Sequence, residues 1–385
     1  MNHEKPLKIL VFSFDWRNLF ENDFAQLKQK MVRDRLAPDF NEIFIIGWSD
    51  SFFYKKLEKV QAYHLKTFFT RARIIYDFLL IFLAPFILFR KKFKPDVVVI
   101  REFPLGLPAL AVKLFFKTKI VFFLGSMPTT LAKARSWAIL RTAYHYFFQL
   151  VCLKIVDIFL ANGQATRDYL IKAGATESAI KIMVEDVINR DKEFIAQSVK
   201  GKIREYYKIS DDQKIIFTVS RLEKEKGVER IIKALAKLKR DDLILILVGA
   251  GSMEKELIDL TCELGVQNKV IFAGYQKREL IWNYYRDADI FMLLSYSEGN
   301  PTVLREAMYV GVPIIGSKIA PIIEFVGEKE ERGFVWSEED GLEKLGEKID
   351  LCLGESEVMK QKKVKAKNYI NENIKDNYLI NDFVE

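Results

Sequence analysis

The chain has 385 residues, half of them apolar and 29% charged, a balance typical of folded proteins with packed cores. At about 150 residues per domain, the length predicts two or three domains. The 60 basic and 52 acidic residues give a net charge of +8, which an ordinary solvated surface explains. No arginine-rich stripe with interleaved aromatic residues occurs, so nucleic acid is not an expected partner. A phosphorylated substrate or an anionic membrane surface suits the charge better.

The cysteines and the N-terminus indicate a cytoplasmic protein. Cys152, Cys262 and Cys352 lie far apart, in no zinc-binding spacing, and so few thiols favour a reducing compartment. The first residues, MNHEKPLKILVFSFDW, are polar and then form an apolar strand pattern, without the core of a signal peptide.

Short apolar runs alternate with longer helical patterns through the first half. The runs predict buried strands at KILVFSF, EIFIIGW, DVVVIR, KIVFFL, DIFLAN and IKIMV. Helical patterns between them include ENDFAQLKQKMVRDR and ARSWAILRTAYHYFFQLVCLKIV. Runs that are apolar throughout, rather than alternating, are typical of parallel strands covered on both faces.

Residues 71–94 contain an apolar run from Phe78 to Phe89, interrupted by Pro85. The run is too short to span a bilayer, which takes about 20 residues. Residues 74–89 therefore form either a helix buried against a sheet or a helix lying at a membrane surface. The second alternative rests on the flanking basic residues, which suit anionic headgroups: Arg71, Arg73, Arg90, Lys91, Lys92 and Lys94.

The second half repeats the alternation, with strands predicted at KIIFTV, LILILV, KVIFAG, ADIFMLL and VPIIG. Two such series predict two Rossmann-like, doubly wound α/β domains facing across a cleft. We place the first domain at 1–190 and the second at 191–359. A lysine-rich helical tail, from about 360 to 385, follows without a strand. Ligands of such sheets bind beyond the carboxyl ends of the strands, so the strand-to-helix turns of the second half are the candidate sites.

Two of these turns suit a diphosphate. In FTVSRLEKEKGVERI, Arg221 and Lys226 follow a strand and precede a helix, and two cations beside a helix N-terminus can bind a diphosphate. A plain solvated loop explains this stretch equally well. In ILVGAGSMEKEL, Gly249 and Gly251 follow the next strand, so that backbone can approach a ligand closely. A dinucleotide fingerprint would require a third glycine where Glu254 stands, so NAD is not expected.

The third turn, SEGNPTVLREAM, carries two acids. Asn300 is the expected N-cap and Pro301 the first helical residue, which leaves Glu298 in the loop and Glu306 about 9 Å further along the helix axis. The helix N-terminus between them suits phosphate, and the two carboxylates can accept hydrogen bonds from hydroxyls. A nucleotide-sugar offers ribose hydroxyls, a diphosphate and sugar hydroxyls in that order. A capped helix with two surface glutamates is the alternative.

The sequence offers little for a metal or a hydrolytic triad. Asp287 and Asp289 form a D-x-D pair, but they lie where a helix gives way to a buried strand, so Asp289 is expected to lead into that strand and no metal is expected. The three histidines have no serine or cysteine motif beside them, which argues against a triad hydrolase.

From about Thr218 to Val326 the chain resembles glycosyltransferase family 4, retaining enzymes of the two-domain GT-B fold (glycosyl transferases group 1). SRLEKEKGVERIIKAL, LVGAGSMEKEL, VIFAGY and LIWNYYRDADIFMLLSYSEGNPTVLREAMYVGVPIIGS occur in the family's order, with the two glutamates separated by seven residues. The first half departs from the family pattern. FSFDWRNLFEND lacks the glycine-rich loop, and KIVFFLGSMPTT has Gly125, Ser126 and Thr129 in place of a histidine.

The resemblance implies a role for each site residue. Arg221 and Lys226 would neutralise the diphosphate, Glu306 would hold the ribose, and Glu298 with the backbone amides of Gly299, Asn300 and Thr302 would bind the sugar. Gly249 and Gly251 would let backbone close on the nucleotide, while Gly274 and Tyr275 would face the base. It also implies a UDP-sugar or GDP-sugar donor, no cofactor or metal, and a C-terminal helix that crosses back to the first domain.

We therefore expect a cytoplasmic retaining hexosyltransferase that acts on a glycan or lipid-linked acceptor, peripheral on the inner face of the membrane. Two alternatives stay open: a non-catalytic nucleotide-sugar-binding scaffold of a glycan-assembly complex, and another GT-B enzyme such as a nucleotide-sugar epimerase. The epimerase would require an acid–base cluster that the sequence lacks.

Overall fold

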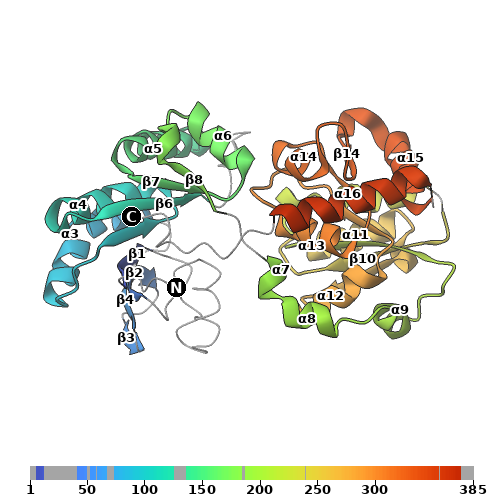
Figure 1. The fold of residues 1–385 in the computed structure, drawn as a ribbon, viewed down its shortest axis with the longest axis horizontal. Coiled ribbons are helices and arrows are strands. Elements are labelled where there is room, and N and C mark those ends of the chain that lie inside the picture. The colour runs from blue at the N-terminus through green and yellow to red at the C-terminus, as the bar shows by residue number, and fades with distance from the viewer. Residues whose placement is uncertain are drawn as a thin grey trace. The chain divides into compact units, whose positions relative to one another are not determined.

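The computed structural model describes residues 6–12, 41–49, 53–57, 59–66, 73–124, 136–183, 187–238, 240–354 and 356–373. The chain forms two compact units: unit 1 takes in the chain up to Glu185, and unit 2 runs from Asp186 to Asp376. Each unit is built on its own sheet (Figure 1).

Unit 1 contains an eight-stranded sheet in the order β3-β4-β2-β1-β5-β6-β7-β8. All neighbouring strands run parallel except β3 and β4, which form an antiparallel pair. The sequence predicted six of the eight and missed β3 and β4, because their lysines, glutamine and tyrosines interrupt the apolar runs. The strands are β1 Lys8–Phe12, β2 Glu42–Ser49, β3 Phe53–Leu57, β4 Val60–Lys66, β5 Val97–Ile100, β6 Lys119–Leu124, β7 Ile158–Ala161 and β8 Ile180–Ile182.

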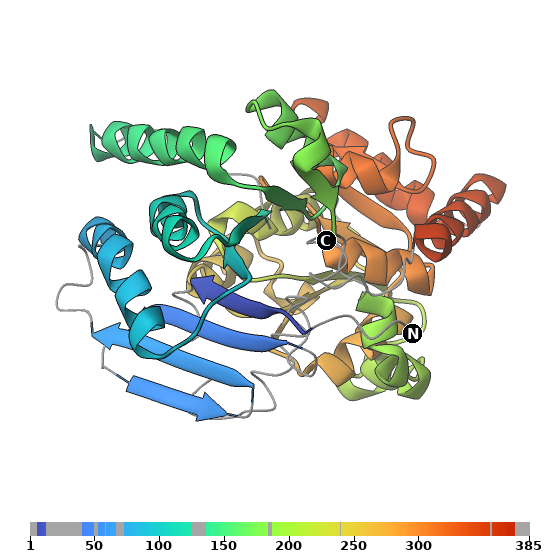
Figure 2. The same cartoon turned by 60° about the vertical axis from the view of Figure 1, so that its left-hand side comes forward.

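Helices cover one face of this sheet, where Leu80, Ala84, Val112 and Phe148 join a core with Leu10 and Phe44 of the strands. Figures 1 and 2 both show α3 beside α4, and Figure 2 adds α5 beyond α4. Among the helices the structure describes, none combines the length and hydropathy needed to cross a bilayer. The helices and 3-10 turns described in unit 1 are α3 Arg73–Arg90, η1 Phe103–Leu105, α4 Gly106–Phe116, α5 Ser136–Ile155, α6 Gln164–Lys172 and η2 Glu177–Ala179.

Unit 2 contains a six-stranded parallel sheet in the order β11-β10-β9-β12-β13-β14. Counted from β9, this is the 3-2-1-4-5-6 order of the Rossmann fold, and the direction of winding reverses between β9 and β12. Every strand predicted for the second half is present, and a short sixth strand, β14, was missed. The strands are β9 Lys214–Val219, β10 Leu243–Val248, β11 Val270–Gly274, β12 Ile290–Leu293, β13 Ile314–Ser317 and β14 Phe334–Trp336.

Helices lie on both faces of the second sheet. One face packs against α10 Val228–Leu238, α11 Glu254–Glu263 and α15 Gly341–Leu353. The other packs against α12 Arg278–Asp287, α13 Thr302–Val310, α14 Ala320–Val326 and α16 Glu357–Asn373. Short helices α7 Val187–Arg190, α8 Lys192–Gln197 and α9 Lys202–Tyr207 begin the unit, and 3-10 turns η3 Lys224–Lys226, η4 Gln267–Lys269 and η5 Glu338–Asp340 complete it. Continuous apolar strands with two helical layers are the arrangement that the sequence predicts.

The C-terminal helix α16 packs on α13 of unit 2, where Ala366 and Ile370 join the core around Leu304 and Ala307. Its described part, to Asn373, therefore belongs with the second sheet. A return of the chain to the first domain would concern residues 374–385, which lie outside the described residues. The same is true of the predicted helix ENDFAQLKQKMVRDR, of the segment FSFDWRNLFEND after its first residue, Phe12, and of Gly125, Ser126 and Thr129.

Candidate functional site

The strand order of unit 2 brings the candidate turns to one edge of the sheet. β9 is flanked by β10 and β12, and β10 is flanked by β11. Because these strands are parallel, the turns that follow them emerge side by side. The arginine–lysine turn and the glutamate turn meet where the winding reverses, which is where ligands of open α/β sheets bind.

Lys226 and Glu298 are in contact across this edge. Their Nζ and Oε1 atoms lie 2.8 Å apart, with the side chains only 17% and 9% exposed. The Ser295 hydroxyl donates to the same Oε1 at 2.7 Å. In the described part of the chain both donors therefore use one oxygen of Glu298, while Oε2 is left to accept a further hydrogen bond. A largely buried pair of this kind is far less screened than a surface ion pair.

Backbone contacts fix the two turns to each other. The Tyr296 amide donates to the Glu225 carbonyl at 2.8 Å, and Arg230 on α10 donates to the Leu294 carbonyl at 3.0 Å. The Arg230 guanidinium also lies 3.5 Å from the centre of the Tyr296 ring. These contacts hold Lys226 opposite Glu298. Sequence reasoning missed them because they join positions that are 71 and 64 residues apart.

Arg221 lies at the same edge but is not part of this pair. Its side chain is 70% exposed and contacts Glu225, four positions along the chain, at 2.8 Å. An exposed pair of this kind contributes little stability, so the guanidinium can turn toward an anion at little cost. The structure thus places both predicted cations at the site, one buried in an ion pair and one exposed.

The two glycines after β10 are required by the neighbouring turn. Gly249 has a φ of 137°, and a Cβ at this position would lie 1.8 Å from the carbonyl oxygen of Ser220. A Cβ on Gly251 would lie 2.3 Å from the carbonyl oxygen of Leu222. The sequence suggested that these glycines admit a nucleotide. The structure shows that they let the turns after β9 and β10 pack backbone against backbone. Gly274 ends β11, with its carbonyl accepting from the Gly249 amide at 2.9 Å, and Tyr275 next to it is 80% exposed.

The helix after the glutamate turn begins one residue later than predicted. α13 starts at Thr302 with Pro301 as its N-cap, and no side chain caps it. The Asn300 side chain instead accepts a hydrogen bond from Arg305 at 3.2 Å. Its expected role as the N-cap is therefore wrong, because a guanidinium on the same helix binds its oxygen. Gly299 is buried, and Thr302 is the first residue of the helix.

Glu306 is buried rather than open. Only 1% of it is exposed, and Arg278 and Tyr285 of α12 bind one carboxylate oxygen each, at 2.5 and 2.8 Å. Two carboxylates on one helix stretch were predicted to face a ligand together. The structure gives them different environments: Glu298 borders the edge of the sheet with Lys226, and Glu306 belongs to a buried network. Nothing in the sequence signals Arg278, which lies 28 positions away from Glu306.

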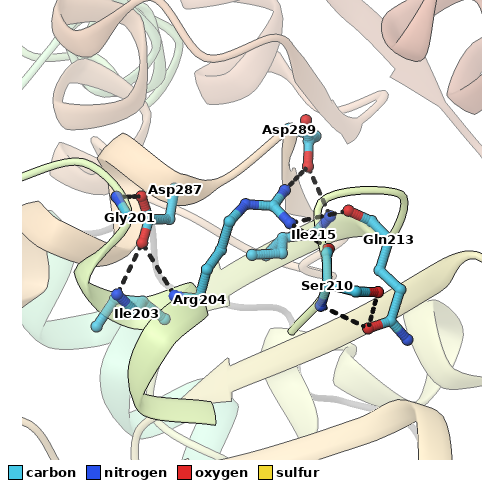
Figure 3. Close-up of polar contacts among 8 residues, drawn as sticks. All are labelled: Gly201, Ile203, Arg204, Ser210, Gln213, Ile215, Asp287 and Asp289. Carbon is cyan, nitrogen blue, oxygen red and sulfur yellow. Dashed lines mark hydrogen bonds and ion pairs between the residues drawn. The ribbon is translucent and has the colours of Figure 1, made fainter. Parts of the chain in front are cut away.

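Asp287 and Asp289 serve the fold. Asp287 accepts hydrogen bonds from the backbone amides of Ile203 and Arg204, at 2.7 and 3.2 Å, and from the amide of Gly201 (Figure 3). These three amides lie at the N-terminus of α9. Asp289 pairs with Arg204 at 2.8 Å and accepts from the Ile215 amide at 2.8 Å. Asp289 leads directly into β12, as the sequence predicts. Within the described residues no cluster of three or more potential metal ligands occurs.

Comparison with solved structures identifies the fold. HepE from Anabaena, crystallised with UDP and glucose, superposes with a TM-score of 0.69 at 18% identity, covering 96% of this chain and 95% of that one. Sucrose-phosphate synthase from Thermosynechococcus elongatus gives 0.75 at 16% identity, covering 95% and 94%. The chain therefore has the GT-B fold of two Rossmann-like domains, as predicted.

Comparison of sequences finds a match in the second half of the chain. Residues 199–372 match the family model of glycosyl transferases group 1. An uncharacterized glycosyltransferase of Methanocaldococcus jannaschii is 35% identical over 129 residues, 33% of each chain. N-acetyl-alpha-D-glucosaminyl L-malate synthase of Bacillus anthracis is 29% identical over 190 residues, 44% of this chain and 49% of that one. The matched part thus spans a third to a half of these relatives.

Proposed function

We propose that this protein is a retaining glycosyltransferase that moves a sugar from a nucleoside-diphosphate donor, UDP-linked or GDP-linked, to a hydroxyl of a glycan or lipid-linked acceptor. The observation that carries the proposal is the Lys226–Glu298 pair, 2.8 Å apart at the point where the winding of the second sheet reverses. A cation and an acid held together there provide one group for a phosphate and one for a sugar hydroxyl.

Lys226 and Arg221 would neutralise the diphosphate. Lys226 is largely buried, so its charge acts in a medium where electrostatic interactions are stronger than in water. Arg221 is exposed and can bind the second phosphate with two parallel hydrogen bonds. Together they would supply the charge that a divalent metal supplies elsewhere. We propose that no metal takes part, and the engagement of Asp287 and Asp289 by backbone amides and Arg204 supports this.

Glu298 would orient the sugar. Its Oε2 can accept a hydrogen bond from a sugar hydroxyl, while Oε1 stays bound to Ser295. In the transfer, the bond from the anomeric carbon to the phosphate oxygen breaks, and the acceptor oxygen bonds to that carbon on the same face. The acceptor proton passes to the departing phosphate. Stabilising the leaving diphosphate, rather than attack by a protein nucleophile, would provide the catalysis.

The relatives support a nucleotide-sugar donor. HepE, which shares the fold, has been crystallised with UDP-glucose, and the matched relatives include a glucosaminyl L-malate synthase and a D-inositol 3-phosphate glycosyltransferase of Mycolicibacterium smegmatis, 30% identical over 167 residues. Their acceptors differ, so the acceptor of this chain is proposed from its own surface.

Release of free nucleoside diphosphate tests the transferase proposal. We expect slow hydrolysis of one UDP- or GDP-sugar by the wild-type protein, and its loss in Lys226→Ala. Lys237→Ala provides a matched control, because Lys237 is an exposed lysine on α10, away from the turns. A donor that binds but is never turned over with any acceptor mixture would favour the scaffold, and inversion at C2 or C4 of the free sugar would favour an epimerase.

We further propose that unit 1 binds an anionic membrane surface, which would bring a lipid-linked acceptor to the enzyme. The helix α3 has one face in the core, while its opposite face exposes an apolar stripe at the helical spacing i, i+3, i+4 and i+7. Its members are Ile75, Phe78, Leu79, Phe82, Phe86 and Phe89, with Phe82 77% and Phe89 80% exposed. The buried face supports the core-helix alternative for residues 74–89, and the exposed apolar face supports the membrane-surface alternative.

The neighbouring helices α4 and α5 also expose large apolar side chains. Leu114 and Phe115 at the end of α4 are 74% and 76% exposed, and Tyr146 and Phe147 on α5 are 60% and 56% exposed. The Phe78 ring lies 6.2 Å from Phe148 of α5, so α3 and α5 are close. An exposed apolar area that spans three helices is typical of a protein-binding or membrane-binding surface.

Charge favours a lipid surface over a protein partner. α3, α4 and α5 each lead into a parallel strand of the same sheet, so their C-termini lie at one edge. Exposed basic residues gather there: Arg90, Lys92, Lys94, Lys117, Lys119 and Lys154. Asp157 at this edge is bound by Lys113 at 2.6 Å, and Asp96 also lies there. Aromatic side chains beside such a basic edge suit the boundary of an anionic bilayer.

Co-sedimentation with vesicles tests this surface. We expect the protein to bind phosphatidylglycerol vesicles and not phosphatidylcholine vesicles, and we expect a Phe82→Ser/Phe86→Ser variant to lose most of that binding. Tyr206→Ser is the matched control, since Tyr206 is 74% exposed on α9 of unit 2. Equal binding by wild type and the double variant would return α3 to a purely structural role.

A further inference from the structure

Unit 2 contains a buried network of four charges beside the edge described above. Arg278, the first residue of α12, lies between two carboxylates that are each only 1% exposed, Asp191 and Glu306. Arg190 binds the second oxygen of Asp191 at 2.8 Å. The two negative charges of the acids are balanced by the two positive charges of the arginines, and buried carboxylates are tolerated when they are paired in this way. The family resemblance assigns a role to Glu306 and none to its partners.

The network fixes the orientation of the Glu306 carboxylate. Arg278 Nη2 donates to Oε1 at 2.5 Å, and the Tyr285 hydroxyl donates to Oε2 at 2.8 Å. Arg278 Nε in turn donates to Asp191, which also accepts from the Trp282 indole at 3.0 Å. Arg278 is therefore bound to Asp191 through Nε and to Glu306 through Nη2. The planar guanidinium fixes the directions of these two contacts, which the rotatable donors of an ammonium do not.

The chemistry of these groups keeps Glu306 able to accept more. Burial lowers the pKa of Arg278, but Glu306 and Asp191 outweigh this and raise it overall, so the guanidinium stays charged. Burial and the nearby Glu306 raise the pKa of Tyr285, so the phenol stays a donor. An ionised carboxylate has about four acceptor positions. Among the described residues, Arg278 and Tyr285 take one position on each oxygen, which leaves one on each oxygen for a neighbouring pair of hydroxyls.

Of the two side chains that bind Glu306 in the described part of the chain, Arg278 is the one that is partly exposed. Its side chain is 32% exposed, whereas Glu306, Asp191, Tyr285 and Trp282 are all buried. A pair of adjacent hydroxyls would therefore meet the acid at the guanidinium. In a nucleoside diphosphate, the 2′- and 3′-hydroxyls of ribose are such a pair, and deoxyribose lacks one of them.

We propose that Arg278, anchored by Asp191, is a positioning residue that holds Glu306 ready to bind the ribose hydroxyls of the donor nucleotide and so makes the site select ribose over deoxyribose. This inference rests on the proposed function. It adds the residues Arg278 and Asp191, and it makes the preference for ribose depend on a network rather than on Glu306 alone.

Titration calorimetry with matched nucleotides tests the inference. The probes are UDP, GDP, their 2′-deoxy forms and inorganic pyrophosphate. We expect the wild-type protein to bind UDP or GDP about tenfold or more tightly than the deoxy form, as for the loss of one hydrogen bond to a charged group. In Arg278→Lys and in Asp191→Asn this ratio should fall to near one, while the affinity for pyrophosphate stays within about twofold.

Arg204→Lys is the control, because Arg204 also binds a carboxylate of unit 2, Asp289, at 2.8 Å. It should lower the thermal stability without changing the ribose preference. If both network variants keep the wild-type ratio and only lose stability, Arg278 is a structural residue and the inference is overturned. A wild-type protein that binds UDP or GDP without any ribose preference also overturns it and leaves the proposed function standing. If the protein binds none of these probes, the proposed function itself is overturned instead.

Discussion

At the scale of single residues, Lys226 is held by Glu298 alone in the described part of the chain, at 2.8 Å and 17% exposed. Replacing it with alanine should weaken the binding of a nucleoside diphosphate by about 1.5–3 kcal/mol, because one charge-assisted contact to phosphate is lost. Calorimetry with UDP and GDP would measure this, with Lys237→Ala as the control. An affinity equal to wild type would remove Lys226 from the phosphate site.

Glu298→Gln should separate binding from turnover. The amide keeps the shape of the side chain but removes the charge that competes with phosphate for Lys226, so UDP or GDP should bind at least as tightly as to wild type. Turnover of the sugar donor should fall about a hundredfold or more, the usual effect of removing one group that stabilises the reacting centre. Weaker binding of the nucleotide together with unchanged turnover would contradict the role proposed for Glu298.

Sequence reasoning identified residues at the edge of the second sheet but not their partners. Lys226 and Glu298 follow β9 and β12, so the rule for parallel sheets was enough to bring them together. Arg278, Asp191 and Arg230 could not be found in this way, because side-chain contacts between distant helices leave no periodic pattern. Asn300 was misassigned because a preference for the N-cap position says nothing about a competing arginine.

At the scale of elements, the turns after β9 and β10 depend on Gly249. Its φ is 137°, and a Cβ at this position would lie 1.8 Å from the Ser220 carbonyl oxygen, which leaves no room for alanine. Gly249→Ala should destabilise unit 2 by about 2–4 kcal/mol, combining backbone strain and steric overlap. Chemical denaturation followed by tryptophan fluorescence would measure this loss.

Gly265→Ala separates the two causes. Gly265 also has a positive φ, of 68°, but its Cβ would meet nothing within 4 Å. The substitution should therefore cost only about 1 kcal/mol, the conformational part alone. Equal losses in both variants would show that the contact with the turn after β9 does not matter.

The pattern of apolar residues predicted most elements of both sheets, because a parallel strand buried on both faces must be apolar throughout. It missed β3 and β4, the last two strands at one side of the first sheet. Their sequences, FYKKL and VQAYHLK, contain polar side chains and are not apolar throughout. It also left α3 undecided between core and surface. One helix can do both, since Leu80 and Ala84 pack inward while Phe82 and Phe86 point outward.

At the scale of the whole molecule, the net charge of +8 and the apolar face of unit 1 predict vesicle binding that depends in part on salt. Raising the salt concentration should screen the basic edge formed by Arg90, Lys92 and Lys94, because interactions between exposed charges are screened over about 8–10 Å. The apolar part should persist. Binding that salt leaves unchanged would show that the basic edge does not contact lipid.

The central claim is that the diphosphate of an activated sugar lies at the reversal point of the second sheet. A crystal structure of the protein soaked with the UDP- or GDP-sugar that it binds tests this most directly. We expect a phosphate oxygen within hydrogen-bond distance of Lys226 Nζ, a sugar hydroxyl on Glu298, and the ribose beside Glu306 and Arg278. A nucleotide bound elsewhere, with Lys226 still paired to Glu298 and no phosphate near it, would contradict the claim.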